Sequence, residues 1–289
     1  EFSVARDFLM RAMREMEHKG DCRELGQVAC DVASNEVRYW DSRRDWANVA
    51  ALDLLLTSAS TAVRLLGPNR QRQRDTLEYA QALTRWANGC FKAGCVAPQA
   101  EGYEYLDKAD AAIAEVRTLM ASSLPSPVLG RALLVGGVTD LVRGHSQRRD
   151  RRPRAVYRET IKRAADKFFA AEEVLVASLG EVNESSMYTH GNLAELYFGD
   201  VRNLQQGLLH FHACCWVGVR LYGPEHANVR RKLEEYSQLL NALGHEQLAQ
   251  RVLVGDLTSL EHRALPERLG QRAPGVTLEE WAAEAGDSD

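Results

Sequence analysis

Long apolar runs and abundant cysteine are both missing from this sequence. Its longest uncharged stretch, 203–219, covers 17 residues and includes asparagine, glutamine and histidine, whereas a membrane-spanning helix needs about 20 apolar residues. The first turns are charged, unlike a secretory signal. Six cysteines in 289 residues indicate reduced thiols rather than a disulfide framework. We therefore expect no membrane partner and a cytoplasmic location, with the nucleus as the alternative.

A strong charge of one sign is missing as well. Lys and Arg number 36 and Asp and Glu number 40, which gives a net charge of −4 at pH 7 and no general attraction for nucleic acid. The sequence also lacks a phosphate-binding glycine loop and a nucleophile elbow. Although catalytic triads assemble from distant residues, nothing in the pattern indicates an enzyme. We expect no catalytic residues and no cofactor.

Histidine and cysteine gather at one place, 210–215. His210 and Cys214 are four residues apart, so on a helix they could share a zinc ion. No second pair of ligands at a short spacing completes such a site, and Phe211 and Trp216 surround the cluster with core residue types. Because buried free cysteine packs as a small hydrophobic residue, we predict packing here and no metal.

Apolar residues recur at helical spacing along almost the whole chain, without the alternation typical of strands. The clearest stripe follows Pro153 and ends near Gly180. The pair Gly223-Pro224 ends a later helix, since glycine caps a C-terminus and proline discourages continuation. The first half predicts helices over 4–19, 23–40, 44–66, 71–90, 103–122 and 128–143. The sequence therefore predicts an all-α protein.

An internal repeat indicates which all-α architecture to expect. The segment Val63–Pro68 recurs as Val219–Pro224, 156 residues later, and a third Leu-Gly stop at Leu179-Gly180 precedes Gly223 by 43 residues. Helix–turn–helix units of about 40 residues stack into a solenoid, because each hairpin buries its apolar face against its neighbours. We predict an array over 1–265, with a basic loop near 144–154, and a tail over 266–289. In that tail, Thr277 and Glu280 fit the capping box of a short helix that carries Trp281.

The repeats resemble a known family. Leu179-Gly180 followed by Asn192–Tyr197, and the run Leu221–Val229, resemble tetratricopeptide units of the kinesin light chain and amyloid-protein-binding protein 2 type. The resemblance covers 162–253 well and 57–88 fairly. It implies a right-handed tetratricopeptide-like solenoid that serves as a non-enzymatic adaptor or scaffold and holds a peptide or partner protein on its concave side. The finer alternatives it implies are a substrate receptor of a cullin-type ubiquitin ligase and a cytoskeletal or motor-associated adaptor.

The resemblance also suggests where a partner would bind. Twelve residues after Gly180 the family places an asparagine on the concave face, which corresponds to Asn192. Its amide can both donate to and accept from a peptide backbone. Twelve residues after Gly223 the same position holds Glu235, which suggests a basic ligand portion; the alternative is that Glu235 pairs with Arg231 on a solvated surface. The predicted binding residues are Ser185, Thr189, Asn192, Glu195, Arg231 and Glu235.

A basic segment, 143–163, carries nine Lys or Arg against two acids. A nuclear-import signal, a contact for an acidic partner and a nucleic-acid-binding surface are the functional alternatives. Aromatic residues hardly interrupt the segment, which disfavours binding of single-stranded nucleic acid. The interpretation we favour is an exposed loop that precedes a helix and is kept soluble by its charge.

Overall fold

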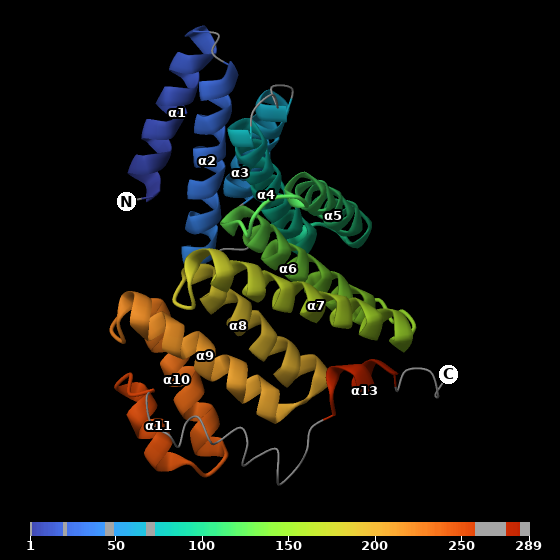
Figure 1. The fold of residues 1–289 in the computed structure, drawn as a ribbon, viewed down its shortest axis with the longest axis vertical. Coiled ribbons are helices and arrows are strands. Elements are labelled where there is room, and N and C mark those ends of the chain that lie inside the picture. The colour runs from blue at the N-terminus through green and yellow to red at the C-terminus, as the bar shows by residue number, and fades with distance from the viewer. Residues whose placement is uncertain (1, 20–21, 44–48, 68–72, 258–275, 284–289) are drawn as a thin grey trace. The chain divides into compact units, whose positions relative to one another are not determined.

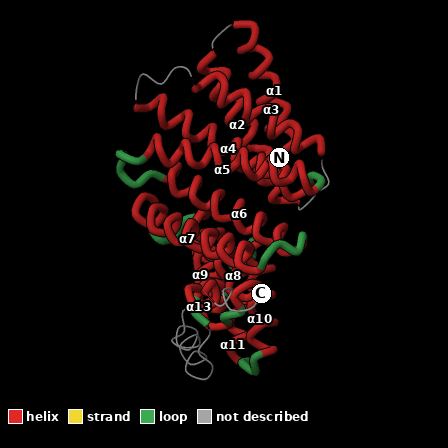
Figure 2. Tube along the Cα trace, turned by 90° about the vertical axis from the view of Figure 1, so that its right-hand side faces the viewer, coloured by secondary structure: helices red, strands yellow, loops and turns green. Residues whose placement is uncertain are grey.

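A computed structural model describes residues 2–19, 22–43, 49–67, 73–257 and 276–283 (Figure 1). Throughout these ranges the regular structure is helical, and none of their residues lies in a β-strand (Figure 2). The predicted all-α class is therefore confirmed. The chain divides into two compact units, Glu1–Ser146 and Gln147–Asp289. None of the described helices is long and apolar enough to span a membrane.

The first unit stacks helices that follow one another in the chain. Consecutive members from α1 to α5 pack side by side, and the short connections make neighbours antiparallel. Residues of α4, α5 and α6, among them Leu106, Ile113 and Val128, share one apolar core. The helices are α1 (Phe2–Lys19), α2 (Cys22–Arg43), α3 (Val49–Leu66), α4 (Gln73–Val96), α5 (Gln99–Met120) and most of α6 (Pro127–Arg149).

Helix α4 runs six residues beyond its predicted end at Cys90 because it crosses α5 very closely. A Cβ on Gly94 would lie 2.9 Å from Leu106 Cγ and 3.1 Å from the Gly102 carbonyl oxygen. Glycine is therefore required where the two backbones meet. Glycine has a low helix propensity, and this close crossing explains why Gly94 nevertheless lies within α4.

The second unit confirms the helix ends predicted at Gly180 and Gly223, and a third glycine, Gly244, ends a helix in the same way. Gly180, Gly223 and Gly244 follow α7, α9 and α10 with φ of 81°, 78° and 79°, the backbone conformation that glycine adopts without strain. Gly67, the counterpart of Gly223 in the repeat, is not among the positive-φ glycines. The elements are α7 (Arg154–Leu179), α8 (Glu184–Leu196), the π-helix η2 (Tyr197–Val201), α9 (Leu204–Tyr222), α10 (Ala227–Ala242), α11 (Glu246–Leu253) and α13 (Leu278–Ala283).

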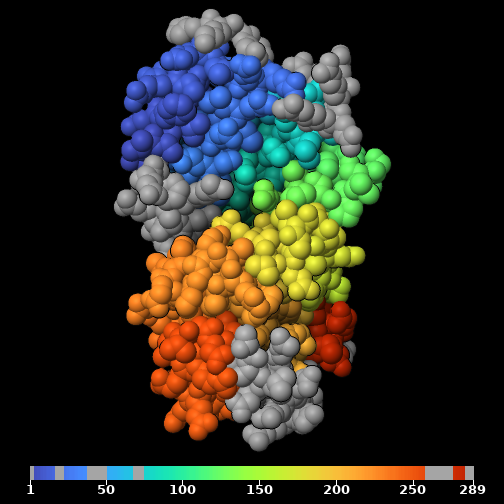
Figure 3. All heavy atoms as spheres, turned by 60° about the vertical axis from the view of Figure 1, so that its left-hand side comes forward, coloured from blue at the N-terminus to red at the C-terminus, as the bar shows by residue number. Residues whose placement is uncertain are grey.

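The last described helix, α13, folds back onto α7. The predicted capping box is present, since the Glu280 N–H donates to Thr277 Oγ1 at 3.1 Å and the Thr277 N–H donates to Glu280 Oε2 at 2.9 Å. Trp281 meets Tyr157 edge to face, with ring centroids 5.9 Å apart. In Figure 3, α13 is the dark red patch that adjoins the yellow surface of α7.

The basic loop expected near 144–154 is shorter than predicted. Helix α6 continues to Arg149 and α7 begins at Arg154, which leaves four connecting residues. Arginine is a good helix former, so the charged run extends α6 rather than ending it. Pro153, at the N-cap of α7, fixes where the second helix starts.

Candidate functional site

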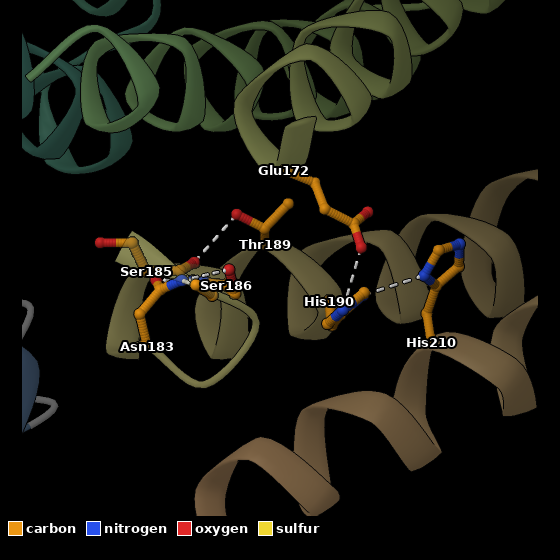
Figure 4. A network of polar contacts seen from close by, with 8 residues as sticks. Glu172, Asn183, Ser185, Ser186, Thr189, His190 and His210 are labelled. Atoms are coloured by element: carbon orange, nitrogen blue, oxygen red, sulfur yellow. Dashed lines mark hydrogen bonds and ion pairs between the residues drawn. The ribbon is translucent and has the colours of Figure 1, made fainter. Parts of the chain in front are cut away.

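The predicted binding residues of α8 differ in how deeply they are buried. Ser185 and Thr189 are buried, and the Thr189 hydroxyl donates to the Ser185 carbonyl oxygen at 2.9 Å. They stand beside the N-cap residue Asn183, whose Oδ1 accepts from the Ser186 N–H at 2.8 Å (Figure 4). These side chains fix the start of α8, because the cap satisfies a backbone donor that would otherwise lack a partner.

Asn192 and Glu195 are more open to solvent than Ser185 and Thr189. Glu195 is exposed and Asn192 is half-buried. The Asn192 amide nitrogen donates to the Tyr188 carbonyl oxygen, 2.9 Å away within the same helix. Its Oδ1 accepts no hydrogen bond from the described part of the chain. The carbonyl end of this amide is therefore available to a ligand donor.

The predicted pair on α10 forms as an ion pair on the surface. Arg231 Nε lies 3.6 Å from Glu235 Oε1, one helical turn away, with both side chains partly exposed. Such i,i+4 pairs contribute about 0.3–0.5 kcal/mol. The two residues therefore form the solvated pair that is the simpler interpretation. Opening this pair for a ligand would cost little free energy.

The Lys232 side chain of α10 reaches α8 at a glycine that sequence reasoning missed. A Cβ on Gly191 would lie 3.5 Å from Cys214 Sγ of α9 and 3.6 Å from Lys232 Nζ of α10. Lys232 therefore reaches across α9 to the backbone of α8. Gly191 directly precedes Asn192 on α8, and Lys232 lies one turn before Glu235 on α10. The sequence signal for this contact was a glycine in the middle of a regular helix, because such a glycine often lets another element approach the backbone closely.

A buried polar network joins α7, α8 and α9 (Figure 4). His190 Nε2 lies 3.2 Å from Glu172 Oε1, and His190 Nδ1 lies 3.2 Å from His210 Nδ1. The His210 ring stacks on Tyr197, with a centroid separation of 5.6 Å and an interplanar angle of 7°. His210 thus pairs with a histidine of another helix instead of with Cys214.

Burial keeps both histidines neutral. It lowers the pKa of His190 from 6.5 to about 4. For His210, burial together with the neighbouring His190 lowers the pKa to about 3. Burial also raises the pKa of the Glu172 carboxyl. One tautomeric arrangement satisfies all three groups: His210 Nδ1–H donates to His190 Nδ1, and His190 Nε2–H donates to Glu172.

The paired cysteines pack in the core, as predicted. Cys214 is fully buried and Cys215 is 1% exposed. Burial raises the pKa of both thiols, more strongly for Cys215, which makes them poor nucleophiles. Among the described residues, no group of three or more His, Cys, Asp or Glu side chains is arranged to hold a metal ion.

Comparisons with known proteins returned one solved structure. No protein-family model matches the chain, and no curated protein matches its sequence significantly. The structure of BtubC (BKLC) from P. vanneervenii is similar with 15% sequence identity and a TM-score of 0.40, covering 84% of this chain and 91% of that one.

Proposed function

We propose that this protein is a non-enzymatic scaffold that binds a peptide segment or partner protein on the exposed sides of α8 and α10. The observation that carries the proposal is the half-buried Asn192, whose Oδ1 accepts no hydrogen bond from the described residues. It lies on the helix that Lys232 of α10 contacts at Gly191. An asparagine so placed can accept a hydrogen bond from a ligand's backbone N–H.

Two exposed acids would favour a basic group on the ligand: Glu195, one turn after Asn192 on α8, and Glu235, one turn after Lys232 on α10. Glu195 and Glu235 are exposed, and within the described ranges Glu235 is held by the weak pair with Arg231. A basic side chain on the ligand would gain a carboxylate partner there by displacing Arg231. The buried residues Ser185 and Thr189 would support this surface by fixing the start of α8 rather than by touching the ligand.

Affinity capture with matched variants tests the proposal. The wild-type protein is compared with Asn192→Ala and Glu235→Lys, and with the control Glu173→Lys on an exposed position of α7. We expect partners seen by mass spectrometry to be retained by wild type and control and depleted by both variants, with melting temperatures unchanged. Undiminished capture by both folded variants would place the binding surface elsewhere.

The same experiment separates the finer alternatives. Cullin-ligase components among the variant-sensitive partners would identify a substrate receptor, and microtubule or motor proteins would identify a cytoskeletal adaptor. A helical repeat fold accommodates either partner class, since function depends on the site and not on the fold.

A further inference from the structure

A pocket of about 430 Å³ opens on the second unit, and none of the residues that line it belongs to α8 or α10. Its volume falls within the range of about 300–1,000 Å³ that is typical of small-ligand sites. The end of α6, the start of α7, η2 and α13 line it together. Five of the lining residues are arginines and one is an aspartate; they are Arg148, Arg152, Arg154, Arg158, Arg202 and Asp200.

Aromatic rings hold two of the arginines in place. The Arg158 guanidinium lies 5.0 Å from the centroid of the Trp281 ring and donates a hydrogen bond to the Trp281 carbonyl oxygen. The Arg148 guanidinium lies 5.8 Å from the Tyr157 ring centroid. Cation–π contacts of this kind orient a guanidinium without neutralising its charge.

Positive charge exceeds negative charge in the pocket. The Asp200 side chain is 2% exposed, accepts from the Tyr157 hydroxyl and lies 3.8 Å from Arg148. Arg152, Arg154 and Arg202 form no ion pair with any acid in the described ranges. One buried carboxylate and five arginines therefore line the pocket.

The N-terminus of helix α7 adds to the excess of positive charge in the pocket. Its first turn contains no acid and begins with Arg154, although a helix N-terminus carries a partial positive charge that favours acidic side chains. The placement of arginines there is unfavourable in the absence of an anion. A bound anion would relieve the repulsion from the arginines and from the helix terminus together.

The backbone around the pocket is also unusual. Arg151 and Arg202 have φ of 54° and 59°, and they are the non-glycine residues with positive φ in the described part of the chain. Arg202 follows the π-helix η2. Left-handed non-glycine residues and π-turns are enriched at ligand-binding sites. The backbone conformation is therefore a second observation that points to this pocket as a binding site.

We propose that this pocket binds a compact phosphorylated ligand carrying at least two negative charges. Guanidinium groups match phosphate oxygens in bidentate geometry, and several of them converge here from separate elements. A nucleic-acid backbone would instead need cations spread along a track. The site is independent of the peptide-binding surface proposed above.

Calorimetric titration of the full chain with pyrophosphate at constant ionic strength tests the proposal. The variant Arg152→Gln/Arg154→Gln removes two pocket arginines that form no ion pair within the described ranges. The control Arg149→Gln removes a neighbouring arginine that does not line the pocket. We expect saturable binding to wild type, a loss of at least about tenfold in affinity for the double variant, and a change below about twofold for the control. Unliganded melting temperatures should be equal.

Competing probes distinguish the source of the phosphate. Displacement of pyrophosphate by a phosphoserine peptide, but not by its unphosphorylated form, would assign the site to a phosphorylated protein. Displacement by fructose bisphosphate alone would assign it to a small phosphate ester. The proposal is overturned if pyrophosphate does not saturate, if Arg149→Gln weakens binding as much as the double variant, or if an oligonucleotide binds better than every compact probe.

Discussion

The histidine pair between α8 and α9 should make the protein lose stability in mild acid. The native pKa values of about 4 for His190 and about 3 for His210 lie below the unfolded value of 6.5. Below pH 6.5 the unfolded state therefore binds more protons than the native state. The stabilising contribution of the neutral pair is complete above pH 6.5 and is lost as the pH falls toward the native values.

The size of this loss follows from the two shifts. At pH 5.5 an unfolded histidine is almost fully protonated, whereas its native counterpart is not. Each histidine therefore lowers the free energy of unfolding by about 1.4 kcal/mol relative to pH 7.5. For the pair this amounts to about 3 kcal/mol, a large share of the stability of an ordinary domain. Both side chains are mostly buried, so solvent screening reduces the figure little.

Urea denaturation followed by circular dichroism at pH 7.5 and 5.5 measures the effect. The double variant His190→Gln/His210→Gln should lose most of the pH dependence, whereas the exposed control His226→Gln should keep it. Proton NMR of the imidazole rings gives an independent check, because two histidines should remain neutral at pH 5. Equal pH dependence in wild type and double variant, or titration of every histidine near pH 6.5, would refute the reasoning.

Three stability predictions follow from packing and capping, each checked by urea denaturation. Gly94→Ala should destabilise the first unit by about 1–3 kcal/mol, since its Cβ would press on the Gly102 carbonyl. Trp281→Ala should cost about 3 kcal/mol and release α13 from α7, visible as faster amide exchange in α13. Asn183→Ala should cost about 1 kcal/mol, because the Ser186 N–H loses its acceptor, and Asn183→Ser should restore most of it.

Local features of this protein could be read from the sequence because their causes lie within a few residues. Pro153 and Gly180 bound α7, and Gly223 ends α9, since proline and glycine act through their own backbone angles. The capping box of Thr277 and Glu280 needs only a spacing of three residues. Helical periodicity along the chain determined the all-α class in the same way.

Contacts between elements depended on the tertiary structure. The sequence showed His210 beside Cys214, but folding pairs it with His190, 20 residues away. Sequence alone assigned the basic segment to a solvated loop, because nothing local showed that Arg158 would meet Trp281, 123 residues further on. Side chains so distant in sequence are brought together by helix packing, which depends on crossings such as that of Gly94 with Gly102. The local sequence thus determined where the helices form, whereas the packing of those helices determined which side chains meet in the sites between them.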